Sequence, residues 1–370
     1  MKTIKTWSKL ALVGLTAASL VACGGSEKAE EVAKVDAKAE VINWKMVTTW
    51  PKNFPGLGTG AEGLAQSITE MSGGRLNVKV YAAGELVPAL EVFDAVSRGT
   101  AEMGHSGAFY WKGKAPAAQF FSAVPFGFTA QEMNSWLHNG GGLELWEEVY
   151  APFNVIPMAA GNTGVQMGGW FNKEINSLED FQGLKMRLPG LGGEVLRKVG
   201  GTPVNLPGGE IFTALQTGTI DATEWVGPYN DLAFGLYKAA EYYYSPGWHE
   251  PGSTMEAIFN KDAFEALPKD LQLIVRAAAR QANAVMLDEF TARNNAALES
   301  LVNEHNVVLK TFPNEVLVAL KAAAEETLEE VASADPMSRK VYDSFKDFNS
   351  KVRAWHEVSE RAFINAREVE

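Results

Sequence analysis

Short apolar segments alternate with amphipathic helical segments through most of this chain, and that alternation limits the fold more than any other feature. Residues 41–48 predict a strand, residues 61–71 a helix, and residues 76–80 a second strand in which every other side chain is apolar. A helix at 87–97 and a strand at 101–106 continue the pattern. Strands that alternate with helices favour a mostly parallel sheet with helices on its faces, so the predicted fold class is α/β.

The same alternation returns after residue 160 and predicts a second α/β unit. We expect strands at 164–171, 184–188 and 221–226, with helices at 192–199 and 209–217. A strand near 255–260 is expected to carry the chain back to the first unit. The 370 residues are enough for two domains of ordinary size.

The chain becomes helical after Pro268. Three long helices are predicted, at 271–304, 313–332 and 336–367, and the last has no internal proline or glycine. Helices average ~11–12 residues, so this last helix is unusually long. Two interpretations stay open: it packs on a second subunit, or it wraps the outside of its own domain.

The N-terminus has the pattern of an exported lipoprotein. Residues 1–22 combine three lysines with an apolar run that is too short to span a bilayer, as in a signal peptide. Cys23 is the only cysteine, and Leu20–Gly25 resembles a bacterial lipobox in which this cysteine is lipidated. An ordinary signal peptide that happens to contain a cysteine is the alternative. Residues 23–40 then form a lipid-anchored tether rich in Ala, Glu and Lys.

The charge balance restricts the partners. Without the three leader lysines the chain has 30 basic against 45 acidic side chains, a net charge of about −15. Such an acidic chain is not expected to bind nucleic acid. An anionic ligand would need a local positive group, because the field of the whole protein repels it.

One motif suggests an enzyme. Gly58–Gly63 matches the G-x-G-x-x-G pattern of dinucleotide-binding proteins, but a loop with two prolines separates it from the preceding strand. The five histidines are not spaced for a zinc helix. An NAD-dependent oxidoreductase is therefore kept only as an alternative, and the chain is predicted not to be an enzyme.

Four segments offer groups for a binding site. Arg187 ends a short apolar strand before a glycine-rich turn, where it is placed to bind a carboxylate bidentately or to form a structural salt bridge. Glu224 and Trp225 end another strand, as a cleft wall or as a surface acid beside a core aromatic. Gln166 lies among glycines, and Glu250 precedes a Pro-Gly turn.

Together these segments resemble the extracytoplasmic solute receptors of tripartite ATP-independent periplasmic (TRAP) transporters, and most closely the group that binds monocarboxylate 2-oxoacids. The resemblance runs from about Asn43 to near the C-terminus and includes Trp50-Pro51, Gly84–Pro88 and Gly107–Trp111. It implies a two-domain, periplasmic-binding-protein-like fold with hinge strands and long C-terminal helices. The expected domains are 41–160 with about 253–310, then 161–252, followed by C-terminal helices over 311–370.

The resemblance also implies roles for particular residues. Arg187 would pair with the substrate carboxylate, with further contacts from Tyr110, Gln166, Trp225 and Glu250. A sodium or calcium ion would be held by Gln166, Glu224, Trp225 and Glu250, with Trp225 contributing its backbone carbonyl because an indole has no acceptor. Further aromatic residues are candidates for the pocket wall, and about half of them are expected to be core residues instead: Trp50, Phe54, Trp111, Trp170 and Trp248.

The implied function is that of the substrate-binding subunit of a TRAP transporter. It would capture a small organic acid, a 2-oxoacid such as pyruvate, together with a cation, close around it and deliver it to the membrane subunits. The protein would lie in the periplasm, anchored through Cys23, and residues 336–367 would form a homodimer. A structural envelope lipoprotein without a small ligand is a second alternative.

Overall fold

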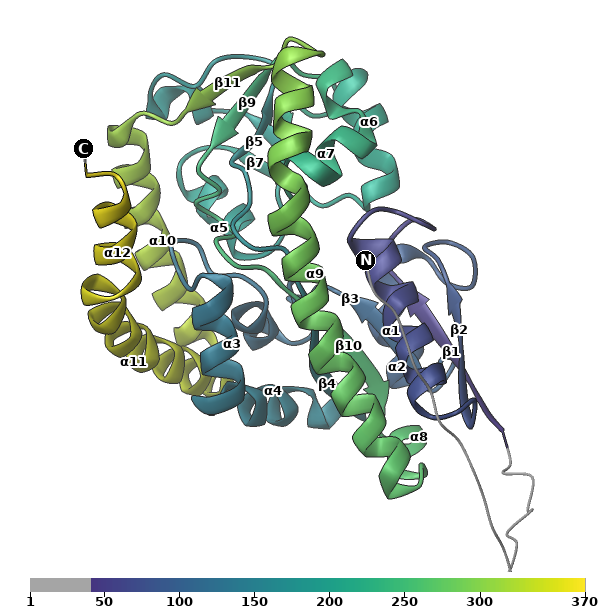
Figure 1. The fold of residues 1–370 in the computed structure, drawn as a ribbon. Coiled ribbons are helices and arrows are strands. Elements are labelled where there is room, and N and C mark those ends of the chain that lie inside the picture. The colour runs from purple at the N-terminus through teal and green to yellow at the C-terminus, as the bar shows by residue number, and fades with distance from the viewer. Residues whose placement is uncertain (1–40, 370) are drawn as a thin grey trace, which may run out of the picture. The chain divides into compact units, whose positions relative to one another are not determined.

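The computed structural model describes residues 41–369, so the predicted signal peptide, Cys23 and the tether lie outside the described residues. The first sheet has five strands in the order β2-β1-β3-β10-β4 (Figure 1). Its strands are β1 (Ile42–Thr48), β2 (Leu76–Tyr81), β3 (Met103–Ser106), β4 (Val155–Asn162) and β10 (Thr254–Asn260). β1 pairs in parallel with β2 and β3, whereas β10 runs antiparallel to β3 and β4.

The second sheet has six strands in the order β11-β9-β5-β8-β6-β7. They are β5 (Gly169–Phe171), β6 (Lys185–Arg187), β7 (Thr202–Val204), β8 (Ala222–Thr223), β9 (Tyr242–Ser245) and β11 (Val308–Thr311). β6 is parallel to β7 and β8, and β11 is parallel to β9, while β5 is antiparallel to β8 and β9. The predicted α/β class is confirmed, but both sheets are mixed. The domain boundaries expected from the sequence stay a prediction.

Shorter helices cover the sheets. They are α1 (Leu57–Met71), α2 (Val92–Ser97), α3 (Ala130–Asn139), α4 (Gly142–Tyr150), α5 (Gly190–Lys198), α6 (Gly208–Gln216), α7 (Pro228–Phe234) and α8 (Lys261–Glu265). Short 3₁₀ helices fall at Ala89–Glu91, Ala108–Trp111, Pro116–Phe121, Ala151–Phe153, Leu178–Phe181 and Leu236–Lys238.

Two long helices pack on strands or helices of the α/β units. α9 (Lys269–Asn303) packs on β4 and α1 beside the first sheet and on α7 beside the second. In Figure 1 it runs from beside α7 past β4 and β10 to α8. α10 (Asn314–Ala334) packs on α5 and on the helix that follows it. The chain crosses between the sheets at residues 163–168 and returns at 246–253.

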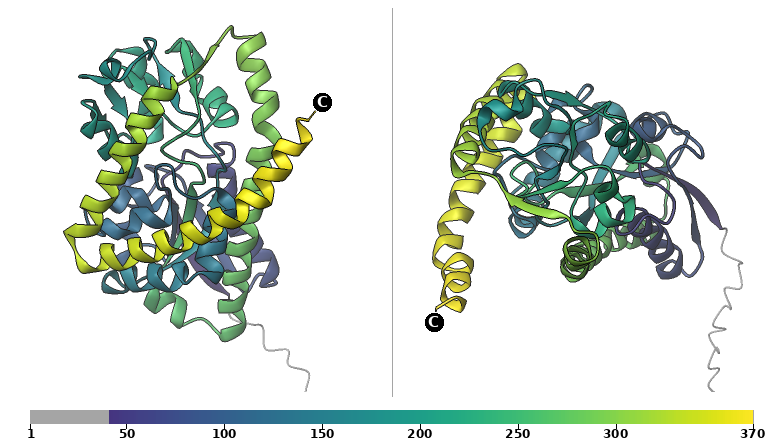
Figure 2. Two further views of the ribbon diagram at one scale, coloured as in Figure 1. Left: turned by 90° about the vertical axis from the view of Figure 1, so that its left-hand side faces the viewer. Right: turned by 90° about the horizontal axis from the view of Figure 1, so that it is seen from above.

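The predicted helix 336–367 is two helices, α11 (Pro336–Val358) and α12 (Glu360–Arg367). They meet at Ser359, whose φ of −113° and ψ of −100° are not helical and whose hydroxyl donates to the Trp355 carbonyl at 2.8 Å. A serine that bonds back to the preceding turn bends a helix. The right-hand view in Figure 2 shows the end of α11 and α12 projecting away from the neighbouring elements. Within residues 41–369, no helix combines the length and apolar character needed to cross a membrane.

The glycines of Gly58–Gly63 lie inside the first turns of α1. A β-carbon on Gly58 would stand 2.5 Å from the Pro51 carbonyl oxygen, and one on Gly60 would stand 2.6 Å from the Met286 methyl group. The backbone contact accounts for Gly58 without a bound dinucleotide, whereas a β-carbon on Gly63 would meet no atom within 4 Å.

Candidate functional site

All six residues predicted for the binding site line one cavity of about 20 Å³. Arg187 ends β6, Glu224 and Trp225 follow β8, and Tyr110 lies in the 3₁₀ turn after β3. The other two come from the crossings between the sheets. The full lining is Trp50, Leu57, Phe109, Tyr110, Gln166, Arg187, Glu224, Trp225, Val226, Glu250 and Met255.

Strand direction explains why the arginine meets the acid. β6 and β8 are parallel neighbours in which Arg187 pairs with Thr223, so the residues at their carboxyl ends lie side by side. The carboxyl ends of parallel strands are the usual place for ligands in α/β proteins. The parallel pairing of β6 with β8 therefore places Arg187 next to Glu224.

Arg187 is 1% exposed, and each of its three guanidinium nitrogens donates to a protein group. Nη1 forms an ion pair with the Glu224 carboxylate, Nη2 donates to the Tyr110 hydroxyl at 2.9 Å, and Nε donates to the Leu206 carbonyl at 3.3 Å. Burial lowers the pKa of Arg187, but Glu224 and Tyr110 outweigh it, so its pKa is raised and the group stays charged. The sequence allowed Arg187 either to bind a carboxylate ligand or to form a structural salt bridge. The structure contains the salt bridge, and both of its residues line the cavity.

Gln166 leaves an oxygen free in this cavity. Its Nε2 donates to Glu250 Oε2 at 2.9 Å and to Thr163 Oγ1 at 3.0 Å. Its Oε1 is buried, and no hydrogen-bond donor reaches it within the described chain. A buried polar atom without a partner costs free energy of folding. We therefore expect a cation or a hydrogen-bond donor to bind this oxygen. Burial, with a smaller effect of Glu224, raises the pKa of Glu250 to about 7.

These groups fit a hard cation. The Gln166 oxygen, the Glu224 and Glu250 carboxylates and the Trp225 carbonyl are all oxygen donors, which sodium and calcium prefer. Among residues 41–369 no three His, Cys, Asp or Glu side chains gather for a metal ion. A cation at this place would depend on an amide and a carbonyl as well as two carboxylates.

The other residues that line the cavity are apolar, and of these only Trp50 was among the predicted candidates. Trp50 lines the cavity, and its indole Nε1 donates to His105 Nδ1 at 2.7 Å. Burial lowers the pKa of His105 to about 4, so the imidazole is neutral and able to accept. The other candidate aromatics do not line the cavity: Phe54, Trp111, Trp170 and Trp248.

Several residues at the site were missed in the sequence. Leu57, Val226 and Met255 carry no chemical signal, and only their fold brings them to the cavity. Phe109 adjoins Tyr110 and was detectable by that proximity. His249 is buried with Nε2 3.5 Å from Glu224 Oε2, and its position next to Glu250 was the available signal.

A buried arginine, two carboxylates and an apolar wall that line one cavity are typical of a solute-binding protein. The model of bacterial extracellular solute-binding protein family 7, DctP, matches residues 46–335, and the chain belongs to this family. The predicted relationship to TRAP solute receptors is thereby confirmed. The family consists of solute-binding proteins, so the chain is a binding protein rather than an enzyme.

Individual relatives agree with this assignment. The chain is 44% identical over 96% of both sequences to a monocarboxylate 2-oxoacid-binding periplasmic protein of Nostoc sp. strain PCC 7120. It is 43% identical to a TRAP periplasmic solute-binding protein of Pseudoalteromonas atlantica T6c solved with sodium and pyruvate, with a TM-score of 0.86 over 90% of this chain and 100% of that one. A TRAP solute-binding protein of Bordetella bronchiseptica RB50, a mixed-occupancy dimer with calcium and picolinate, is 38% identical, with a TM-score of 0.87 over 89% and 97%.

Proposed function

We propose that this protein binds a small 2-oxoacid such as pyruvate, together with sodium or calcium, and delivers it to the membrane subunits of a TRAP transporter. The observation that carries the proposal is the meeting of Arg187, two carboxylates and the unpartnered Gln166 oxygen in one buried cavity. Relatives that share 43% and 38% of their residues with this chain hold a carboxylate ligand beside sodium or calcium. Arg187 would hold the carboxylate, and Tyr110 would donate a further hydrogen bond.

The charges in the cavity are a reason to expect a cation beside the bound ligand. If Glu224 and Glu250 are ionised, a bound carboxylate brings the local charge to about −3, and Arg187 supplies one positive charge. Like charges in a poorly solvated cavity repel strongly. Sodium would leave about −1 and calcium a neutral site, so either ion removes much of the repulsion.

The Arg187–Glu224 ion pair gives a second reason why ligand binding would need the cation. The guanidinium donates to Glu224 through Nη1, the group that a ligand carboxylate would need for bidentate pairing. A cation that takes up the Glu224 carboxylate weakens this ion pair and frees the guanidinium. Cation and ligand are therefore expected to bind cooperatively.

Ligand entry requires the two halves to part. A cavity of about 20 Å³ has room for roughly one water molecule, which is less than pyruvate needs. The crossings at 163–168 and 246–253 carry Gln166 and Glu250, and we assign them as hinge segments. Closing would then complete the cation site as well as bury the ligand.

Calorimetry on Arg187→Lys tests the role of Arg187. Lysine keeps the charge but loses the fork of N–H donors, so pyruvate affinity in saturating calcium should fall about 10- to 100-fold, as expected for a lost charge-assisted bond of ~1.5–3 kcal/mol. Arg276→Lys on the exposed face of α9 is the control and should bind like the wild type. Unchanged affinity in Arg187→Lys would remove this residue from the site.

We also propose that Cys23 carries a lipid that anchors the protein to the membrane. The single cysteine follows an apolar run and precedes two glycines, as in a lipobox. Mass spectrometry of the mature N-terminus from a native membrane fraction should find a diacylglyceryl group on Cys23. An unmodified cysteine, or cleavage elsewhere, would disprove the anchor.

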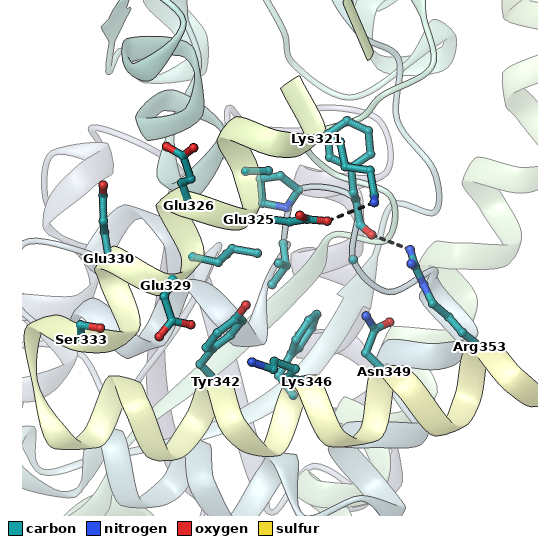
Figure 3. A pocket seen from close by; sticks show the side chains of 17 residues that line it. Lys321, Glu325, Glu326, Glu329, Glu330, Ser333, Tyr342, Lys346, Asn349 and Arg353 are labelled. Atoms are coloured by element: carbon teal, nitrogen blue, oxygen red, sulfur yellow. Dashed lines mark hydrogen bonds and ion pairs between the residues drawn. The ribbon is translucent and has the colours of Figure 1, made fainter. Parts of the chain in front are cut away.

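We propose that α11 and α12 bind a second copy of this chain. Four apolar side chains on this arm are strongly exposed: Trp355 at 62%, Val358 at 70%, Phe363 at 64% and Ile364 at 49%. Beside the arm, a groove of about 790 Å³ lies between α10, α11 and residues 124–127 (Figure 3). Tyr342, Phe345 and Leu328 contribute apolar surface to it, and Arg353 closes one end by donating to the Phe126 carbonyl at 2.8 Å. The dimeric relative from Bordetella bronchiseptica supports a second copy as the occupant.

A further inference from the structure

A buried carboxylate lies directly behind the cation-binding segment. Asp231, on α7, is 1% exposed and contacts neither Arg187 nor the cavity. Three donors from three parts of the second sheet meet on it. The Val226 amide donates to Oδ1 at 3.3 Å, and the Trp170 indole and the Tyr243 hydroxyl donate to Oδ2 at 3.0 and 2.7 Å.

The Val226 amide shares a peptide unit with the Trp225 carbonyl. In a planar trans peptide the N–H and the C=O point in opposite directions. Asp231 accepts from the N–H, so it fixes the carbonyl to point away from α7. When the Asp231 carboxylate is ionised, as at pH 8, its charge also polarises the peptide and makes the carbonyl oxygen a better donor to a cation.

The neighbouring contacts hold this segment on its other side. The Val226 carbonyl accepts from the Met167 amide at 3.0 Å, and the Gln166 amide donates to the Glu250 carbonyl at 3.2 Å. The segments that carry Gln166, Trp225 and Glu250 are thus joined through their backbones, and within residues 41–369 Asp231 is the one ionisable side chain that bonds to the Trp225–Val226 peptide.

We propose that Asp231 is a positioning residue that aims and polarises the Trp225 carbonyl for the cation. This inference rests on the proposed cation site. Asp231 would act as a carboxylate that bonds to a metal ligand and raises its basicity without touching the metal. Loss of such a partner typically weakens metal affinity 10- to 100-fold.

Calcium binding to Asp231→Asn tests the proposal against a matched control. Asparagine has one acceptor oxygen for three donors and carries no charge, so the Kd for calcium, measured by calorimetry at pH 8, should rise about 10- to 100-fold. Tyr243→Phe removes a donor from the same carboxylate but leaves its bond to Val226. It should lower the melting temperature while the calcium Kd stays within about twofold of the wild type.

A second measurement uses the wild type and needs no folded variant. With selective ¹⁵N-valine labelling, the Val226 amide proton should shift downfield on calcium addition, because a cation on the carbonyl strengthens the N–H bond to Asp231. A stationary Val226 resonance, or an equal loss of calcium affinity in both variants, would overturn the inference. Wild-type protein that binds neither calcium nor sodium would instead remove the cation site itself, and the inference with it.

Discussion

At the scale of single residues, burial determines the chemistry of the acidic groups. Asp231, Glu250 and Glu256 are all buried, and burial is the main cause that raises the pKa of each to about 7. Glu256 lies outside the cavity, where the Trp111 indole and the Tyr150 hydroxyl donate to it, the latter at 2.7 Å. It holds the turn that carries Tyr110 against β10.

Glu256 should make stability depend on pH. Its pKa is about 7 in the folded protein against an ordinary 4.5, so the folded state holds the proton more tightly. This contribution is fully present below pH 4.5 and is lost as the pH rises through 7. Glu256→Gln does not titrate, so the stability of the wild type relative to this variant should fall by about 3 kcal/mol between pH 4.5 and 7 in urea melts.

The control is the same substitution at Glu265 on α8, whose side chain is 60% exposed. Glu265→Gln and the wild type should give parallel curves of stability against pH. A constant difference between the wild type and Glu256→Gln would contradict the assignment of a titrating, buried acid at this position.

The chemical residues of the site were predictable because charged and amide groups at strand ends stand out in a sequence. Arg187, Glu224 and Gln166 lie among apolar or glycine neighbours, and the resemblance to TRAP receptors joined them into one site. Leu57 and Met255 were not predictable, because an apolar side chain at a cavity has the same pattern as one in the core. Which of Trp50 and Trp170 reached the cavity also depended on packing between distant segments.

At the scale of elements, some segments were predicted well, but several short strands and the helices α3 and α4 were not predicted. The 35 residues of α9 were predicted to within a few positions, as was the strand β10. The strands β7, β9 and β11 have three or four residues and were not predicted, since their pairing partners rather than their own pattern fix them. β4 was also missed, because Pro157 interrupts its pattern, although proline is tolerated in this edge strand.

The arm formed by α11 and α12 gives a prediction for this scale. Phe363→Glu places a charge on its exposed apolar side, so it should convert a dimer into a monomer in sedimentation equilibrium at micromolar concentration. Asn365→Glu adds the same charge to a different, polar position on α12 and should leave the dimer intact. A wild-type protein that sediments as a monomer would refute the proposed role of the arm.

At the scale of the whole molecule, the two sheets contribute different parts of one site. Arg187, Glu224 and Trp225 come from the second sheet, whereas Tyr110 comes from the first. The α/β class followed from alternating strands and helices, but the mixed strand order did not, because a fully buried strand such as β10 has the same apolar pattern in either direction. Arg187 donates to Tyr110 across the two sheets, so under the proposed function closure and ligand binding would be linked at this contact.

The central claim is that a cation and a 2-oxoacid bind together in the cavity around Arg187 and Glu224. The most direct test is to titrate calcium with and without saturating pyruvate, and pyruvate with and without saturating calcium, on desalted protein. Thermodynamic linkage requires both pairs to change by the same factor, and we predict that each ligand tightens the other at least about tenfold, which corresponds to ~1.4 kcal/mol of coupling. Pyruvate affinity that is equal in chelated and calcium-saturated protein would contradict the claim.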